Sequence, residues 1–111
     1  MVNINLEVSG MHLENILSQK EFLPNEPVKK DIWLSPKFTA ALVCLESGLE
    51  IEPHPEPYSV FFLVLEGRGI FTNGEGSFEL GPMGSITIEA GEIRGMKSLE
   101  RLAVLGIHDP H

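Results

Sequence analysis

The chain has 111 residues, which fits one domain built around a single hydrophobic core. Hydrophobic residues make up 42% and charged residues 22% of the sequence. These values are close to the average of globular proteins and exclude a disordered chain. The formal net charge is −8, and the eight Lys and Arg residues are scattered, so we expect no binding to nucleic acid or to an anionic membrane.

Cysteine content and the N-terminus indicate where the protein works. Cys44 is the only cysteine, which rules out an intrachain disulfide and favours a reducing, cytoplasmic compartment. The first residues lack the basic start and apolar stretch of a secretory signal, and no apolar run approaches the ~20 residues of a membrane helix. Because Cys44 ends the apolar run 39–44, we expect a buried core residue rather than a reactive thiol.

The first part of the chain predicts a short helical turn and one or two strands. Residues 12–18 predict a short helical turn with its apolar side chains on one side. Residues 31–46 predict one long or two short strands, with a break near Ser35-Pro36 and a closing turn at Ser47-Gly48. Gly and Pro recur at short intervals, as is typical of all-β proteins.

The strongest strand signal lies in the middle of the chain. Residues 60–66 are apolar on both faces, which indicates a central strand buried on each side. A tight turn at 67–69 leads into a strand at 70–72, and Asn73-Gly74 predicts a hairpin because both residues tolerate positive φ. Three further short strands are expected at 77–80, 85–89 and 101–107. This spacing indicates a β-sandwich or barrel.

The segment 48–58 carries the best candidates for chemistry. His54 and Glu56 lie two residues apart, and prolines at alternate positions keep the segment extended. The two side chains therefore converge on one spot. Imidazole and carboxylate both bind first-row transition metals, although a metal normally requires three or four protein ligands.

This segment resembles the first sequence motif of the cupin family. In that motif a Gly is followed, after five residues, by His-x-His, then by a Glu and a closing Gly. Gly48 and His54 fit the spacing, and Val-Leu-Glu-Gly at 64–67 matches the end of the motif. The family's second motif resembles the stretch from Gly84 to Arg94, one residue shorter and without its proline.

The resemblance implies an all-β, cupin-type double-stranded β-helix, which is a jelly-roll barrel. It implies a single domain over residues 1–111, with a core at about 35–108 and an N-terminal extension at 1–34. By the same resemblance, the protein is expected to form a homodimer.

On the register of the resemblance, the four metal-ligand positions of the family fall on His54, Glu56, Val60 and Arg94. Val60 has no donor atom, and the protonated guanidinium of Arg94 would repel a divalent cation. We therefore expect no cofactor, with a divalent transition metal on His54 and Glu56 as the alternative. In place of the metal, Arg94 and Glu56 are expected to pair across the pocket.

The predicted pocket combines a few polar groups with an apolar lining, the usual form of a small-molecule site. The expected lining residues are His54, Glu56, Tyr58, Val60, Phe62, Arg94 and Met96, with Trp33 as a further candidate. The alternatives are a hydrogen-bonded barrel residue for His54, a solvent-facing edge residue for Glu56, a surface residue for Arg94, and core packing for Phe62. The tail 108–111 is expected to be frayed and without a specific role.

Three functions fit these observations. The first is a small cupin barrel that binds a small organic molecule without the usual family metal; an anion is a candidate, because Arg94 could bind a carboxylate or phosphate. The second is a metal-dependent dioxygenase, isomerase or decarboxylase that uses His54 and Glu56. The third is a non-catalytic, dimeric structural module. The sequence assigns no catalytic residue.

Overall fold

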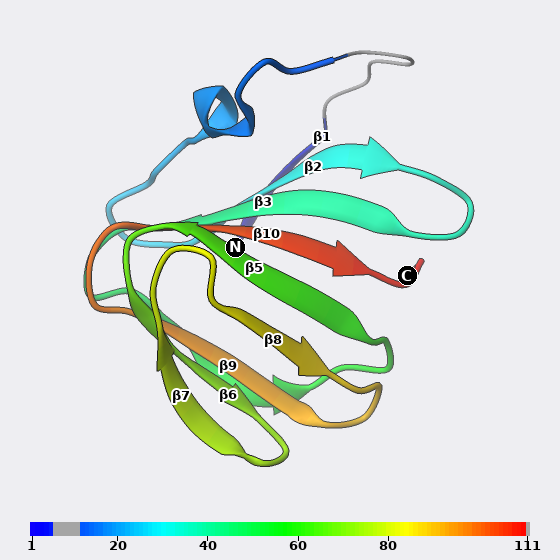
Figure 1. Cartoon of the computed structure of the whole chain (residues 1–111), viewed down its shortest axis with the longest axis vertical. Helices are drawn as coiled ribbons and strands as arrows, with labels where there is room; N and C mark the ends of the chain where they lie inside the picture. The colour runs from blue at the N-terminus through cyan, green and yellow to red at the C-terminus, as the bar shows by residue number, and fades with distance from the viewer. Residues whose placement is uncertain (6–11, 111) are drawn as a thin grey trace.

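The computed structural model describes residues 1–5 and 12–110, and in them the architecture is all-β, as the sequence predicts. Two sheets face each other and enclose the core (Figure 1). Within the described residues the only helix is the 3-10 helix η1 (Ile16–Gln19), which overlaps the helical turn expected at 12–18. The described part of the chain contains no helix long and apolar enough to cross a membrane.

The larger sheet follows the order β1-β2-β3-β10-β5-β8 and is antiparallel except for the pair of β1 and β2. Its strands are β1 (Val2–Asn5), β2 (Val28–Leu34), β3 (Thr39–Leu45), β10 (Leu102–His108), β5 (Val60–Glu66) and β8 (Ser85–Ile88). β10 lies between β3 and β5, so the end of the chain joins strands from two earlier regions.

The smaller sheet follows the order β4-β9-β6-β7 and is antiparallel. Its strands are β4 (Glu50–Pro55), β9 (Ile93–Ser98), β6 (Gly69–Asn73) and β7 (Gly76–Leu80). β6 and β7 form the hairpin predicted at Asn73-Gly74, where the Asn73 Oδ1 accepts a 2.8 Å hydrogen bond from the backbone N–H of Glu75. The side-chain carbonyl thus stabilises the turn from within.

The main apolar core lies between the two sheets. Alternate residues of each strand point inward, as strand geometry requires. The larger sheet supplies Val43, Val64 and Val104, and the smaller sheet supplies Phe71 and Met96. All five are less than a tenth exposed, so this layer carries most of the burial that stabilises the fold.

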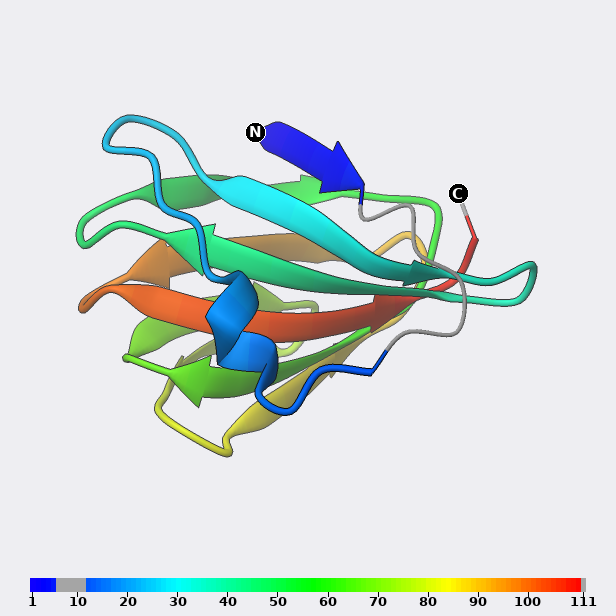
Figure 2. The ribbon, with the colours of Figure 1, turned by 90° about the horizontal axis from the view of Figure 1, so that it is seen from above.

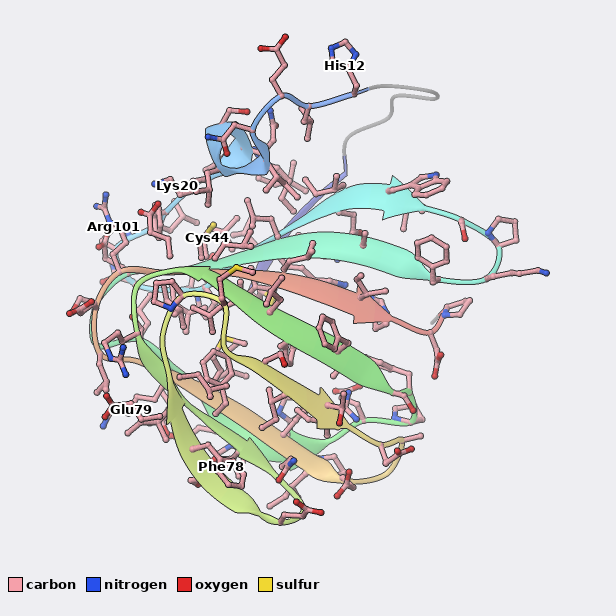
Figure 3. All side chains as sticks on the ribbon, in the orientation of Figure 1. His12, Lys20, Cys44, Phe78, Glu79 and Arg101 are labelled. Atoms are coloured by element: carbon pink, nitrogen blue, oxygen red, sulfur yellow. The ribbon has the colours of Figure 1, made fainter. Side chains whose placement is uncertain are left out.

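A second apolar cluster lies on the outer face of the larger sheet. It contains Leu42 and Cys44 of β3, and Ile16 and Phe22 of the N-terminal segment pack against it. The ribbon shows this segment lying across the larger sheet (Figure 2), and Cys44 lies beneath it (Figure 3). Cys44 is 2% exposed, and burial raises the pKa of its thiol. The expectation of a buried core cysteine is therefore confirmed.

Charged contacts hold this N-terminal segment on the sheet. The Lys20 Nζ lies 2.8 Å from the Glu66 Oε1. The Arg101 guanidinium lies 4.4 Å from the centre of the Phe22 ring, and its Nη2 lies 2.9 Å from the Glu46 Oε2. Apolar packing thus holds the segment on the sheet, and the Lys20–Glu66 pair and the Arg101–Phe22 contact add a smaller contribution at its margin.

Apart from shifts of one residue at strand ends, three features of the observed strands differ from the predicted ones. β5 has the predicted bounds, but its outer face is not buried throughout, because Phe61 is 37% exposed. β9 was not predicted, since Gly95 and two charged residues interrupt its apolar pattern. The larger sheet also begins upstream of residue 35, because β1 and β2 belong to it. The break near Ser35-Pro36 is confirmed, since β2 and β3 are separate strands.

Candidate functional site

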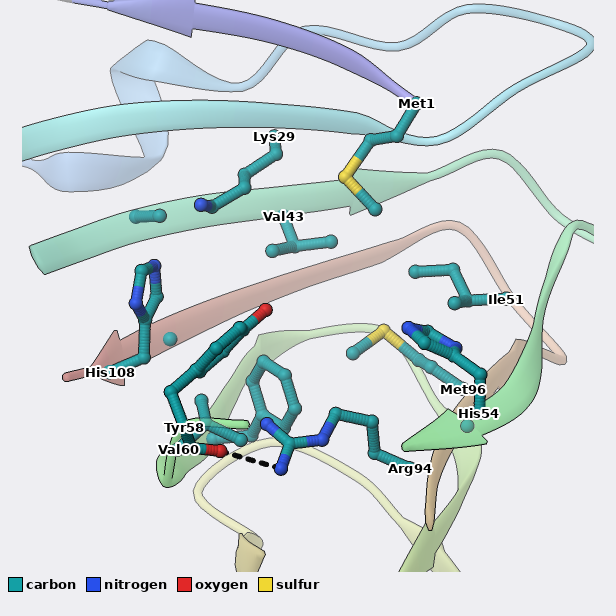
Figure 4. Close-up of a pocket in the computed structure, with 14 residues that line it drawn as sticks. Met1, Lys29, Val43, Ile51, His54, Tyr58, Val60, Arg94, Met96 and His108 are labelled. Carbon is teal, nitrogen blue, oxygen red and sulfur yellow. Dashed lines mark hydrogen bonds between the residues drawn. The ribbon is translucent and has the colours of Figure 1, made fainter. Parts of the chain in front are cut away.

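A cavity of about 100 Å³ lies between the two sheets (Figure 4). Its lining is mostly apolar, with a few cationic, imidazole and hydroxyl groups. The lining residues are Met1, Lys29, Ala41, Val43, Ile51, His54, Tyr58, Val60, Phe62, Arg94, Gly95, Met96, Gly106 and His108. Of the described residues that line it, none is Asp or Glu, so the wall itself supplies no negative charge.

Arg94 is the most deeply buried charged residue of this wall. It lies on β9 directly opposite His54 of β4, and in an antiparallel pair such residues share one face of the sheet. Arg94 is only 6% exposed. Its Nη2 donates hydrogen bonds to the carbonyl oxygens of Tyr58, at 2.6 Å, and of Glu89, at 3.2 Å.

Within the described part of the chain, the remaining nitrogens of Arg94 lack acceptors. Nε and Nη1 are both buried, and neither has a hydrogen-bond partner among the described residues. A guanidinium stays protonated in proteins, and a buried charge without full pairing is costly. The arrangement therefore leaves a fixed positive charge and unused donors at the cavity.

Tyr58 lies between two other lining residues. Its ring centre lies 4.9 Å from the Arg94 guanidinium carbon and 5.0 Å from the centre of the His108 ring. The Tyr58 hydroxyl points into the cavity (Figure 4). Burial raises the pKa of this phenol, the negative charge of Glu56 raises it further, and the positive charge of Arg94 partly opposes both. The hydroxyl therefore stays protonated around neutral pH.

His54 and Glu56 meet each other, as their spacing predicts. The His54 Nε2 lies 3.0 Å from the Glu56 Oε1, and its Nδ1 lies 2.9 Å from the carbonyl oxygen of Glu52. His54 lines the cavity, whereas Glu56, one residue past the end of β4, is not among the lining residues that the structure describes. The carboxylate is thus held by the imidazole at the margin of the site.

The expected pair between Arg94 and Glu56 is not formed by these described residues, and that prediction was wrong. The guanidinium turns instead to backbone carbonyls, including that of Tyr58, while Glu56 pairs with His54. The physical reason is the strand register, which places Arg94 opposite His54 and leaves Glu56 beyond the paired part of β4.

The family's metal positions do not fit a divalent ion in this chain. Val60 offers only a hydrocarbon side chain, Arg94 brings a fixed positive charge, and the His54 Nε2 is already paired with the Glu56 carboxylate. No group of three His, Cys, Asp or Glu side chains that could hold a metal gathers anywhere in residues 1–5 and 12–110. A metal normally requires three or four such ligands.

Two polar side chains of the lining, those of Lys29 and His108, were not predicted from the sequence. His108 is the last residue of β10 and is 7% exposed, so the expectation of a frayed tail was wrong at this position; His111 lies outside the described residues. The His108 Nδ1 lies 2.7 Å from the carbonyl oxygen of Asp109. The alternation of Val104 and Gly106, which both face inward, extends to His108 and could have revealed it.

Lys29 of β2 is the second missed residue. It lies opposite Val43, so its side chain faces the inner side of the larger sheet. The Lys29 Nζ lies 3.4 Å from the Oδ1 of Asp31, which is itself only 7% exposed. Alternation of polar and apolar residues could not reveal this pair. Such a pattern predicts that the apolar residues of a strand face the core, but in β2 Lys29 and Asp31 lie on the inner face and Ile32 lies on the outer face.

Of the other predicted lining residues, four line the cavity and one lies on the surface. Tyr58, Val60, Phe62 and Met96 all line the cavity. Trp33 does not, and that expectation was wrong. It is 58% exposed and packs edge-on against Phe38, with ring centres 5.2 Å apart. A bulge between Asp31 and Trp33 shifts the register of β2 here.

Comparison with known proteins identifies the fold. No protein-family model and no curated protein sequence matches the chain. Several solved structures do match. A cupin superfamily protein from Desulfitobacterium hafniense is 16% identical with a TM-score of 0.80, covering 96% of this chain and 100% of that one. An RmlC-like cupin protein from Desulfovibrio desulfuricans is 20% identical with a TM-score of 0.79, covering 90% and 97%.

A third match is the cupin domain of Cnp3 from Schizosaccharomyces pombe, at 19% identity and a TM-score of 0.74. It covers 86% of this chain and 72% of that chain. At such identities the likeness concerns the fold, and fold alone does not decide function.

Proposed function

We propose that this chain, whose fold is that of a small cupin-type double-stranded β-helix, binds a small anionic organic molecule in the cavity between its sheets. One observation carries the proposal. Arg94 is 6% exposed, lines the cavity, and has two nitrogens without an acceptor among the described residues. A carboxylate or similar anion would supply the missing acceptors and the missing charge.

The rest of the wall suits the organic part of such a ligand. Val43, Ile51, Phe62 and Met96 present apolar surface to the cavity. Small-molecule sites usually combine such a lining with a small number of placed polar groups. The volume of about 100 Å³ suits a small organic acid better than a large cofactor.

The other two predicted functions have less support. A metal-dependent dioxygenase, isomerase or decarboxylase would need ligands that Val60 and Arg94 cannot provide. A dimeric structural module stays a prediction, and sedimentation velocity of the untagged chain would test it. Neither alternative explains why a guanidinium with unused donors should be buried at a cavity wall.

Calorimetric titration with a panel of small organic acids tests the proposal. We expect at least one acid to bind, and Arg94→Met to weaken it by about tenfold to a hundredfold, as for loss of a hydrogen bond to a charged group. Arg94→Lys should bind with intermediate affinity, because it keeps the charge and loses the planar fork.

Arg68→Met is the matched control. Arg68 is exposed and pairs with Glu79 on the surface, so its loss should leave acid affinity unchanged. Circular dichroism of each variant separates loss of the site from loss of the fold. The proposal is overturned if the folded wild type binds no acid, or if folded Arg94→Met binds as tightly as the wild type.

A further inference from the structure

We infer that the cavity selects a monoanion, a carboxylate with an apolar body, over a dianion of the same length, and that Asp31 sets this preference by neutralising Lys29. This inference rests on the proposed function and specifies its ligand. It follows from how positive and negative charges are distributed over the two facing sheets.

Two cationic side chains reach the cavity from opposite walls. Lys29 comes from β2 of the larger sheet, and Arg94 comes from β9 of the smaller sheet (Figure 4). Taken alone, this pair would suit a molecule with an acid group at each end. A ligand that spanned the cavity could then pair with one cation at either end.

Asp31 cancels one of these two charges. Its side chain is 9% exposed, and its Oδ1 lies 3.4 Å from the Lys29 Nζ, whose side chain is 20% exposed. The two residues form an ion pair without a close hydrogen bond, since Asp31 Oδ1 has no hydrogen-bond partner among the described residues. Because both partners are largely removed from water, they interact more strongly than a surface pair.

The charge of Arg94 has no such partner in the ranges 1–5 and 12–110 that the structure describes. Its hydrogen-bond acceptors among the described residues are the neutral carbonyls of Tyr58 and Glu89. The cavity wall therefore carries one positive charge that is not compensated. Glu56 lies outside the lining and pairs with His54, and its charge adds to the bias against a second negative charge in the cavity.

One negative charge on the ligand completes this balance. The carboxylate of a monoacid would face Arg94, and its carbon chain would lie against apolar residues such as Val43 and Met96. A diacid would place its second carboxylate either among apolar side chains or beside the already neutralised Lys29. Burying a charge without a partner is costly, so the diacid should bind more weakly.

The test compares straight-chain monoacids from ethanoate to hexanoate with the matched diacids, by calorimetric titration at about pH 8, above the ordinary imidazole range. We expect the best monoacid to bind the wild type at least about tenfold more tightly than the diacid of equal length. In Asp31→Asn the Lys29 ammonium loses its partner. The ratio of monoacid affinity to diacid affinity should therefore fall by about tenfold.

Two further variants control for overall charge and for folding. Glu79→Gln removes the same negative charge from an exposed pair with Arg68, and it should keep the wild-type ratio. Combining Lys29→Met with Asp31→Asn removes both members of the buried pair, and the double variant should also keep the wild-type preference for monoacids.

The outcomes separate the two proposals. If the wild type binds neither kind of acid, the proposed function falls, and this inference falls with it. If the wild type binds diacids as tightly as monoacids, or if Asp31→Asn keeps the wild-type ratio, the anion site stands and the role of Asp31 is overturned.

Discussion

The Arg94 Nη2 donates a 2.6 Å hydrogen bond to the carbonyl oxygen of Tyr58, while the guanidinium carbon lies 4.9 Å from the centre of the Tyr58 ring. Arg94 of β9 thus contacts both the backbone and the ring of Tyr58, which lies in the connection between β4 and β5. Tyr58 in turn contacts the ring of His108 at the end of β10. The geometry of the cavity therefore depends on contacts between residues far apart in the sequence.

The ionisation of Tyr58 can be followed directly, because the chain has a single tyrosine. Burial, the largest cause, raises its pKa above the ordinary value. We expect phenolate absorbance to titrate at a higher pH in the folded protein than in urea. Arg94→Met should raise the folded pKa further, since the Arg94 charge lowers it. Equal midpoints in the folded and unfolded chain would contradict the buried position of Tyr58.

The same shift predicts how stability depends on pH. The folded pKa of Tyr58 lies above the unfolded value of about 10. The contribution of Tyr58 to the free energy of unfolding is therefore fully present below about pH 10. This contribution is lost as the pH rises through the folded pKa. The unfolding free energy, measured by urea denaturation, should therefore fall above about pH 10. Tyr58→Phe should show a shallower fall, and an unchanged slope would argue against this contribution.

Two glycines with nearly the same backbone angle predict different costs of substitution. Gly48 has φ +86, and a Cβ atom added there would have no atom within 4 Å, whereas Gly67 has φ +84 and an added Cβ would overlap the carbonyl oxygen of Arg101. Gly48→Ala should cost about 1–2 kcal/mol of unfolding free energy, from left-handed strain alone. Gly67→Ala should cost about 1–3 kcal/mol more, because the backbone must shift. Equal urea midpoints for the two variants would contradict the close approach at Gly67.

The covering of Cys44 by the N-terminal segment predicts slow reaction with thiol reagents. The thiol is buried and its pKa is raised by that burial, so little thiolate is available to attack. Leu17→Asp, which places a charge in the covering cluster, should speed modification of the native protein by at least about tenfold. Ser18→Asp is the control, because Ser18 is exposed on the same turn. Equal rates for the two variants would show that the segment does not protect the thiol.

The residues at the family's metal positions predict that acid binding does not require a metal. Treatment with a chelator should leave both the acid affinity and the thermal midpoint unchanged, because His54 and Glu56 are occupied with each other. Elemental analysis of untagged protein, beside His54→Ala, is the direct measurement. A stoichiometric metal that the variant loses would contradict this prediction.

Local pattern was sufficient for much of the fold. The apolar run of β5 and the turn at Asn73-Gly74 have the bounds and hairpin that the sequence predicts. These features depend on side chains and φ preferences within a few residues. The strand β9 escaped prediction because its interior contains Gly95, and its pairing with β4 and β6 outweighs its weak local preference.

The sequence by itself determined three polar groups of the cavity, which are the imidazole of His54, the phenol of Tyr58 and the guanidinium of Arg94, and it predicted that Glu56 meets His54. Only the tertiary structure decided which other groups join them. It turned Arg94 to the carbonyl of Tyr58 instead of Glu56, and it brought Lys29 and His108 to the cavity from distant parts of the chain. The physical reason is that strand order and register join segments far apart in sequence, so non-local pairing sets which side chains line the cavity.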